Sequence, residues 1–318
     1  SWGTPKDVAN ASDPFYYGRS KVASDSFGNA IVTWIGWDLL DGWTYQNVQI
    51  LVSNLAITAS DWSAPTILSN PGLRSPRDLI IKPLFDKYRN AIVLWTNSYD
   101  GSTFVVESAR RSYGTLAWPH FASPQNPNIY SFGMDAAVTS GTVLLTSMAW
   151  DEISAVNIQS QQTDTINPVL QAWTNVNPLS NGDNNAYPKC ALSRTESTLN
   201  AVIAWLYFDG LNTVLHVATG TETVTTPPSN IDAFQTIADF GVFQNFYNTI
   251  TWDASPDLDV AQYNIYRNGI FFAATDPFTL QFVDHNRGQM QEVKYGVSTL
   301  TTSFRQSDPI EITLFGPG

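Results

Sequence analysis

The sequence predicts an all-β protein, on three observations. A short apolar phrase recurs along the first two thirds of the chain, turn signals follow its copies, and no stretch keeps a helical period. The phrase is Asn-Ala, then β-branched or leucine residues, then tryptophan, and its copies begin at Asn29, Asn90 and Asn200. The gaps of 61 and 110 residues predict a missing copy between the last two. Gly141–Thr146 fits that place, with Thr146 at the tryptophan position.

A second phrase, which starts with tryptophan, precedes the first one. Its copies start at Trp2, Trp62 and Trp173, and Trp118 begins a weaker copy. In the three clear cases the opening tryptophan stands 32 or 33 residues before the tryptophan that ends the next apolar phrase. Such constant spacing indicates that both phrases belong to one repeating unit.

A third feature is an aromatic residue followed by aspartate, three or four residues after the phrase tryptophan or its equivalent. The four pairs are Trp37 and Asp38, Tyr99 and Asp100, Trp150 and Asp151, and Phe208 and Asp209. Asp100 and Asp209 are followed by glycine, which is a strong hairpin signal because both residues tolerate positive φ. A β-branched run follows each pair, so each unit is expected to hold four strands in about 55 residues.

Four-stranded units of this length are typical of propeller blades. The chain opens with an isolated last strand near Trp2–Val8 and closes with a unit that lacks its own. If the opening strand completes the fourth blade, no strand edge is left open. The sequence therefore predicts a four-bladed β-propeller over residues 1–222, closed by the N-terminal strand.

This repeat region resembles bacterial β-propeller repeats of the sialidase-like kind. The Asp-box of that group, Ser-x-Asp-x-Gly-x-Thr-Trp, is absent, and Ser24–Gly28 only echoes it. The resemblance therefore implies a fold but transfers no functional residues.

Residues 223–230 are polar with two adjacent prolines and are expected to form a linker. In residues 231–318 apolar side chains alternate along three strand-like runs, and Asn268-Gly269 is a tight-turn pair. The alternating residues are Ile250, Trp252, Tyr263, Ile265, Tyr295 and Val297. They predict the core of a β-sandwich around Trp252, and this region resembles a fibronectin type III module.

The charge balance limits the partners. The net charge is −12 and the pI about 4.5, which disfavours nucleic acid and anionic membrane surfaces. No apolar run of 18 residues occurs, so membrane insertion is not expected. The one cysteine, Cys190, is expected to be a buried, inert thiol. A secreted or cell-surface protein of a bacterium is the expected setting.

Catalytic motifs are not visible. The three histidines, His120, His216 and His285, lack ligand spacing, so neither a catalytic residue nor a metal site is predicted. Asp38–Gly42 and Asn181–Asn185 could ligate calcium, but Asp and Asn are also turn formers, and the turn interpretation is favoured. No cofactor is expected apart from this calcium option. The 28 acidic residues leave a two-carboxylate glycosidase open.

The aromatic–Asp pairs carry the ligand-site hypothesis. On equivalent turns they would ring one face of a propeller, where aromatic platforms and carboxylates hold glycans or peptides. The alternative is that each aspartate caps a turn and each aromatic ring packs on a neighbouring blade. The predicted function is a non-catalytic binding or adhesion module with a glycan or protein ligand. The alternatives are a glycoside hydrolase of sialidase-like type and a structural subunit of an envelope assembly. The sequence does not fix the oligomeric state.

Overall fold

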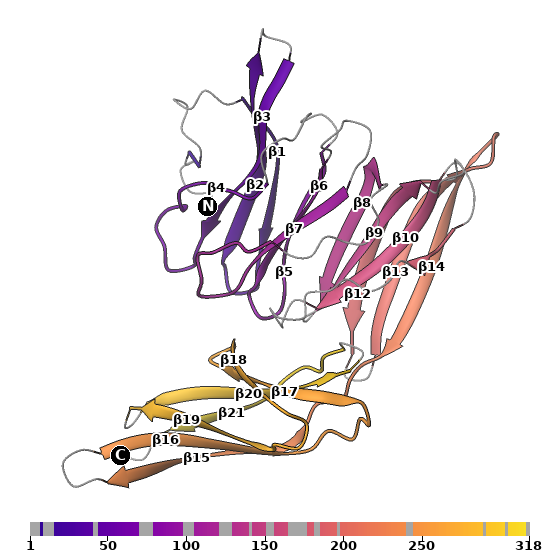
Figure 1. Ribbon diagram of the computed structural model, residues 1–318. Coiled ribbons are helices and arrows are strands. Elements are labelled where there is room, and N and C mark those ends of the chain that lie inside the picture. Colours follow the sequence, from indigo (N-terminus) through magenta and orange to yellow (C-terminus); the bar gives the residue numbers. More distant parts are fainter. Residues whose placement is uncertain are drawn as a thin grey trace, which may run out of the picture. The chain divides into compact units, whose positions relative to one another are not determined.

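The computed structural model consists of strands joined by turns and loops (Figure 1). It describes residues 7–8, 16–40, 44–69, 79–97, 105–120, 129–139, 142–150, 156–164, 177–180, 185–195, 198–239, 244–288, 291–302 and 305–315. Within these ranges there is no helix long and apolar enough to cross a membrane.

The chain divides into two compact units. The first comprises Ser1–Thr165, Gln171–Ser193 and Asn200–Gly220, and the second comprises Ile166–Leu170, Arg194–Leu199 and Thr221–Gly318. The chain passes from the first unit to the second between residues 220 and 221, just before the linker expected at 223–230. Strand pairing resumes at Ser229, inside that expected linker.

The first unit contains four sheets that follow one another along the chain (Figure 1). Sheet 1 is built from β1 (Tyr16–Ser24), β2 (Ala30–Leu40), β3 (Thr44–Leu55) and β4 (Thr66–Ile67). Sheet 2 is built from β5 (Ile81–Phe85), β6 (Ala91–Asn97) and β7 (Val105–Arg111). Sheet 3 is built from β8 (Ile129–Thr139), β9 (Thr142–Trp150), β10 (Val156–Asp164) and β11 (Asn177–Pro178). Sheet 4 is built from β12 (Asn185–Arg194), β13 (Thr198–Phe208) and β14 (Thr213–Thr223).

Each apolar phrase forms the second strand of its sheet, as the repeat predicts. The phrase that starts with tryptophan is reduced to two-residue strands, β4 and β11, which pair with the third strand of sheets 1 and 3. In sheet 2 it is a single bridge between Ala109 and His120. Four sheets of the predicted strand order are therefore present, and none is closed on itself. Closure of the ring by the N-terminal strand remains a prediction, because residues 1–6 lie outside the described part of the chain.

The turns that precede β2 and β6 share one set of side-chain hydrogen bonds, which we call the lock. The Asp86 carboxylate accepts the backbone N–H groups of Tyr88 and Asn90 at 2.9 and 2.8 Å, and the Asn90 side-chain amide at 2.7 Å. Asp25 and Asn29 repeat this arrangement at the start of β2. The asparagine oxygen then accepts a backbone N–H from the far end of the third strand, Tyr113 in the case of Asn90. The recurring Asp-x-x-x-Asn spacing is thus explained by a turn that ties three strands together.

We expect the variant Asp86→Ala to lower the free energy of unfolding by about 2–3 kcal/mol, because Asp86 is buried and three donors lose their acceptor. Asp25→Ala is the matched control: the same lock is more exposed there, and a loss of about 1 kcal/mol is expected. Urea denaturation measures both values. Equal losses in the two variants would show that burial does not set the strength of the lock.

Sheet 2 approaches both of its neighbours along its first strand, because β5 lies against β1, β2 and β8. Side chains of each pair of neighbours form one apolar cluster. The first cluster joins sheets 1 and 2 around Trp95, the second joins sheets 2 and 3, and the third joins sheets 3 and 4 around Trp205. At about 25 cal/mol per Å² of buried apolar surface, these clusters are the main source of stability for the unit.

Sheet 3 departs from the expected repeat register. Val143 and Leu145 face sheet 2, so Thr146 points to the opposite face and does not take the tryptophan position. The reason is the turn before this strand. Thr139 pairs with Thr142 across two residues, whereas Phe85 pairs with Ala91 across five. The shorter turn moves every side chain of β9 by one position, which reverses its faces.

The second unit is a two-sheet sandwich. One sheet has the order β15–β16–β19, from Ser229–Asp239, Gln244–Asp253 and Gln281–Arg287. The other has the order β18–β17–β20–β21, from Ile270–Thr275, Val260–Arg267, Glu292–Thr301 and Ile310–Phe315. The expected Asn268-Gly269 turn joins β17 to β18 with positive φ at both residues.

All six core residues expected for this sandwich are in its main apolar cluster. A buried polar group supports the cluster: the Asp284 carboxylate accepts the Tyr295 hydroxyl at 2.6 Å and pairs with Arg267 at 3.0 Å. Burial and this carboxylate raise the pKa of Tyr295. The sandwich is the architecture that the fibronectin type III resemblance implies.

Candidate functional site

The structure describes only part of the predicted aromatic–Asp ring. Tyr99, Asp100 and Asp151 lie outside the described residues, and Trp150 ends β9 with a side chain that is not described. Trp37 is partly buried and packs against the cluster between sheets 1 and 2, and Asp38 follows it on β2. A common ring of all four pairs therefore remains a prediction.

The last pair lies at the β13–β14 hairpin. Phe208 is 45% exposed, and the Asp209 carboxylate accepts the backbone N–H groups of Leu211 and Asn212 at 2.8 and 2.7 Å. These donors, that of Asn212 first, lower the pKa of Asp209. At this position the aspartate acts as a turn cap.

A different set of charged residues lies on the first strands of the four sheets. In the part of the first strands (β1, β5, β8 and β12) that belongs to the first unit, the basic residues are Arg19, Lys21, Lys82 and Lys189. We call these four residues the basic seam. Asp135 is the only acidic residue on the same stretches, in a chain with 28 acidic and 16 basic residues. The first strands thus reverse the charge balance of the protein.

Asp135 links three of the four sheets. On β8 it is 6% exposed, one oxygen accepts Lys82 of β5 at 2.7 Å, and the other accepts the backbone N–H of Cys190 on β12 at 3.2 Å. The remaining sheet, sheet 1, is linked through Arg19 of β1, which donates to the carbonyl of Leu79, just before β5, at 2.9 Å. Polar contacts therefore run across the first strands of all four sheets.

The backbone is strained at Arg19 of the basic seam and at Tyr187, two residues before Lys189 of the seam. Arg19 on β1 and Tyr187 on β12 have φ values of 52° and 54°, which side-chain-bearing residues rarely adopt. Each is followed two residues later by an exposed lysine, Lys21 or Lys189. In β1 the strained residue lies within a register shift between Gly18 and Lys21. Such bulges bend a strand and redirect its side chains.

Cys190, for which the sequence predicts a buried thiol, lies next to the seam and is partly buried. Burial raises the pKa of its thiol to about 12, and the neighbouring Asp135 carboxylate adds to the rise. Its Sγ is 3.8 Å from the Leu144 carbonyl. A thiol in this setting is a weak nucleophile at neutral pH, because little of it is thiolate.

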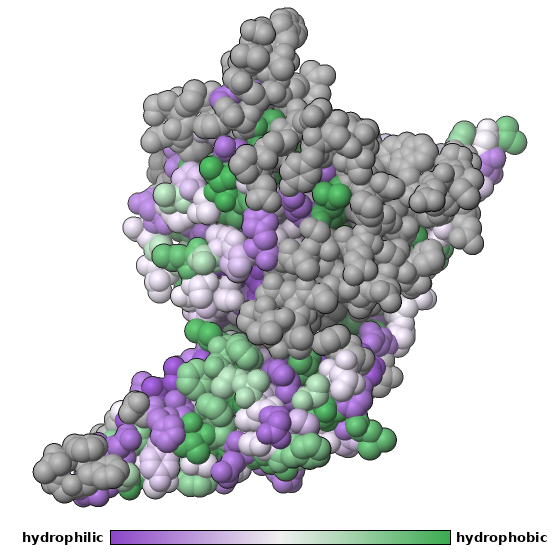
Figure 2. Space-filling model, viewed as in Figure 1, coloured by the Kyte–Doolittle hydropathy of each residue, from purple (hydrophilic) through white to green (hydrophobic). Residues whose placement is uncertain are grey.

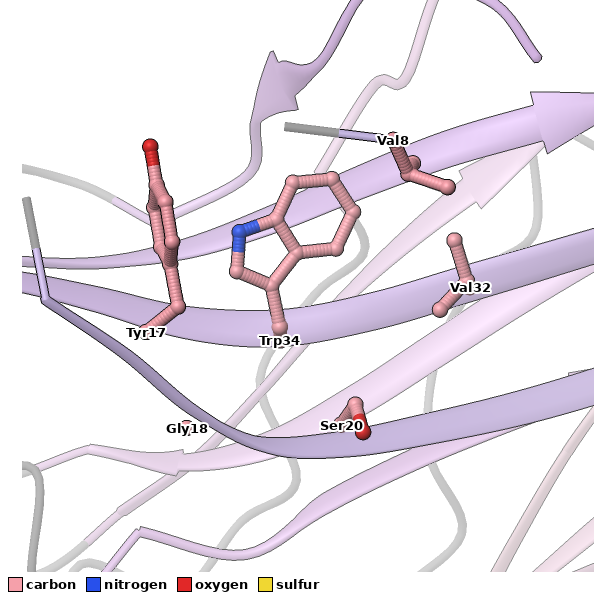
Figure 3. Close-up of a pocket in the computed structure, with 6 residues that line it drawn as sticks. All are labelled: Val8, Tyr17, Gly18, Ser20, Val32 and Trp34. Atoms are coloured by element: carbon pink, nitrogen blue, oxygen red, sulfur yellow. The ribbon is translucent and has the colours of Figure 1, made fainter. Parts of the chain in front are cut away.

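A hollow of about 250 Å³ lies on the free face of sheet 1 (Figure 3). Its lining consists of Val8, Tyr17, Gly18, Ser20, Val32 and Trp34. The Tyr17 and Trp34 rings meet edge to face at 6.5 Å, and Figure 3 shows the indole nitrogen on the Tyr17 side. The described residues that line the hollow are mainly apolar, and none of them is charged.

The histidines all contact aromatic rings. His120 lies edge-on to Trp95, His216 stacks on Tyr207, and His285 lies 5.9 Å from Tyr247. Within the described ranges no three His, Cys, Asp or Glu side chains gather as metal ligands. Of the two calcium candidates, most of Asn181–Asn185 and part of Asp38–Gly42 lie outside those ranges.

The sequence analysis missed the basic seam. Lys21 and Lys82 each stand 8 residues before the asparagine of an apolar phrase, which was the available signal. Asp135 and Lys189 break that spacing, because sheets 3 and 4 have different turns before the second strand.

No protein-family model matches the chain, and no curated protein matches it. Solved structures do match. A Hadza microbial sialidase, Hz136, is 10% identical over 74% of this chain and 50% of its own, with a TM-score of 0.43. An ulvan lyase of polysaccharide lyase family PL25 is 10% identical over 65% of this chain and 52% of its own, with a TM-score of 0.39. The FN1–FN3 domains of chicken CNTN1 are 10% identical over 96% of this chain and 100% of their own, with a TM-score of 0.27. The chain spans about half the length of the sialidase and the lyase.

These matches contradict the predicted non-catalytic binding or adhesion module and the expectation that the chain is not an enzyme. Besides the sialidase and the lyase, they include an exo-β-1,3-galactanase from Clostridium thermocellum and a sucrose-6-phosphate hydrolase from Lactobacillus gasseri. Most of these structures are carbohydrate-active enzymes, so the sequence-based prediction is wrong on this comparison. Its weakness was the search for local motifs: catalytic groups on repeated sheets come from separate strands and leave no motif. At about 10% identity, the matches assign no role to any residue of this chain.

Proposed function

We propose that the first unit is a carbohydrate-active enzyme unit that cleaves glycosidic bonds in an acidic saccharide, and that the basic seam binds the substrate. The observation that carries this proposal is the reversal of charge on the first strands. Four basic residues and one carboxylate lie there, in a chain whose net charge is −12. In the same proposal the four sheets are blades of a four-bladed propeller, with their first strands around its axis.

Electrostatics favours this substrate class over a neutral one. A chain with net charge −12 repels anions at long range, but charges more than about 10 Å apart are largely screened at 0.1 M salt. The local seam therefore decides what binds. Carboxylate or sulfate groups of a saccharide would find ammonium and guanidinium partners there. A neutral saccharide could accept their hydrogen bonds but would gain no charge pairing from them.

Asp135 serves this site as a positioning residue. Both of its oxygens are occupied, one by Lys82 and one by the Cys190 N–H, so neither is directed at a substrate. It holds the Lys82 side chain, which is 36% exposed, at the junction of three first strands. The Tyr187 ring, 62% exposed and two residues before Lys189, offers a flat surface for a sugar.

The proposal is tested with matched panels of acidic and neutral polysaccharides. Released reducing ends report hydrolysis, and absorbance of unsaturated uronates reports lyase cleavage. We expect cleavage of at least one uronate- or sialate-containing substrate and none of the neutral panel. The idea fails if the protein neither cleaves nor binds any acidic saccharide, or if it acts on neutral ones alone.

Reversing the charge of seam residues should weaken the binding of the acidic saccharide selectively. For the double variant Lys21→Glu with Lys189→Glu we expect about a tenfold loss of affinity for the acidic saccharide, from about 0.5–1 kcal/mol per reversed charge. Lys87→Glu makes the same kind of change at an exposed lysine outside the first strands and is expected to have little effect. Isothermal titration at low and high salt measures the affinities. A similar loss in the control variant would assign the effect to net charge instead of the seam.

A further inference from the structure

One edge strand of the second unit lacks the usual protection against pairing with another strand. An unpaired strand edge readily binds further strands, and proteins block such edges with charged residues or proline. In the part of the chain that the structure describes, nine edge strands longer than two residues carry at least one charged residue: β1, β5, β7, β8, β12, β14, β15, β19 and β21. The tenth is β18, whose sequence Ile-Phe-Phe-Ala-Ala-Thr holds neither a charge nor a proline.

The free edge of β18 is open. Its neighbour in the sheet is β17, and among the described residues the backbone of Ile270–Thr275 makes no backbone hydrogen bond to any other segment. Ile270 and Phe272 are 39% and 38% exposed. Figure 2 shows hydrophobic surface, in green, at the place where Figure 1 draws β18. Apolar side chains and free backbone groups therefore lie together on this edge.

The aromatic side chains of β18 are held in place by their own unit. The Arg267 guanidinium lies over the Phe272 ring at 3.8 Å, and the Phe282 ring meets Phe272 edge to face at 5.7 Å. Phe271 meets Tyr266 edge to face at 6.0 Å. A partner of this edge would therefore meet a strand that is already ordered, which lowers the entropy cost of pairing.

The two ends of β18 differ in charge. Asp276 follows its last residue and is exposed. Around its first residue, three basic side chains outnumber two carboxylates by one; they are Arg267, Arg287, Lys294, Asp284 and Glu311. Antiparallel pairing of two β18 strands would bring the acidic end of each to the basic end of the other. Parallel pairing would bring like ends together, which is unfavourable.

We propose that β18 is a dimerisation edge, which pairs antiparallel with β18 of a second copy of this chain. The two four-stranded sheets would then continue as one sheet of eight strands. Such a contact uses the same edge on both copies, so it closes at a dimer. An extended peptide would pair with the same edge but would first have to be ordered, whereas β18 of a second copy is ordered beforehand. The proposal concerns the second unit and does not depend on the activity proposed for the first.

The expected dimer is weak. The contact is one six-residue strand on each copy, and a bulge leaves Phe272 without a partner on β17 between Phe271 and Ala273. A bulge disturbs the regular ladder of a strand. Because contacts smaller than a standard interface are weak, we expect a dissociation constant of about 10–100 µM.

Two measurements test the pairing. Sedimentation equilibrium between about 1 and 200 µM, which brackets the expected constant, should show the mass rising from 35.1 kDa towards the dimer. Hydrogen exchange at the two ends of this range locates the contact. Amides of Ile270–Thr275 should exchange several-fold more slowly in the concentrated sample, and those of the edge strands β15 and β21 should not change. This second experiment uses the unmodified protein, so it does not depend on the folding of any variant.

A charge placed on the edge should weaken the dimer. For Ile270→Lys we expect about a tenfold loss of dimer affinity, since a lysine blocks an edge and occurs twice in the symmetric contact. Leu258→Lys is the matched control: Leu258 is a fully exposed apolar residue in the loop before β17, and no change is expected there.

Four results would overturn the proposal. They are a monomer at every concentration, a dimer whose protected amides lie outside β18, a dimer unaffected by Ile270→Lys, and an equal loss in Leu258→Lys. A synthetic peptide of residues 268–277 separates the remaining alternative. If it slows exchange of β18 in a protein that stays monomeric, the edge takes an extended peptide and not a second copy.

Discussion

Replacing Asp135 with alanine is expected to lower the free energy of unfolding of the first unit by about 3 kcal/mol. The substitution leaves the Cys190 N–H without its acceptor and removes the partner of the Lys82 ammonium at a buried junction of three sheets. Breaking a buried ion pair by deleting one partner costs about 3–5 kcal/mol, and the partial exposure of Lys82 places this case at the lower end. Thermal and urea denaturation followed by tryptophan fluorescence measure the change.

Two variants separate the causes. Asp135→Asn keeps an oxygen acceptor but removes the charge, so a loss of about 1–2 kcal/mol is expected. Asp61→Ala removes a carboxylate at an exposed position of the same unit and should change the stability by less than about 0.5 kcal/mol. If Asp135→Ala is as stable as Asp61→Ala, the junction does not hold the sheets together.

The Cys190 thiol of the folded protein is expected to react about 50-fold more slowly with iodoacetamide at pH 8 than the same thiol in urea. A pKa of about 12, in place of the ordinary 9.0, lowers the thiolate fraction about a thousandfold. The more basic thiolate is intrinsically more nucleophilic, which raises the alkylation rate about 20-fold and offsets part of this decrease. Mass spectrometry of the alkylated chain over time measures both rates.

The carboxylate contribution can be checked in the same assay. Asp135 is the second cause of the raised pKa after burial, so Asp135→Asn should speed the alkylation of the folded protein several-fold. Equal rates in the folded and unfolded chain would mean that the thiol is accessible and its pKa ordinary.

The sequence analysis predicted correctly those features that depend on residues close together in the sequence. The Asn-Ala phrase forms a strand in three sheets, and in two of them the preceding turn is fixed by residues four positions apart, such as Asp86 and Asn90. The same holds for the sandwich core, where Trp252 and Tyr263 lie on neighbouring strand runs with a regular alternation. These signals lie within a few residues of each other and can be read without knowing the tertiary structure.

The seam could not be predicted in this way. Lys82 and Asp135 are 53 residues apart and meet only because two first strands converge. The reversed faces of β9 follow from a turn three residues shorter than its equivalent, a difference with no effect on composition or hydrophobicity. The residues that we propose to bind the substrate escaped the sequence analysis for the same reason, since they come from strands that are far apart in the sequence.

The order of strands within the first unit has a consequence for biosynthesis. In each of its four sheets, hydrogen-bonded neighbours are also neighbours along the chain. A nascent polypeptide can therefore complete each sheet as soon as its own segment has left the ribosome, without waiting for later segments. In the proposed propeller, the joining of the two ends would be the one step that needs the whole unit, and it would come last.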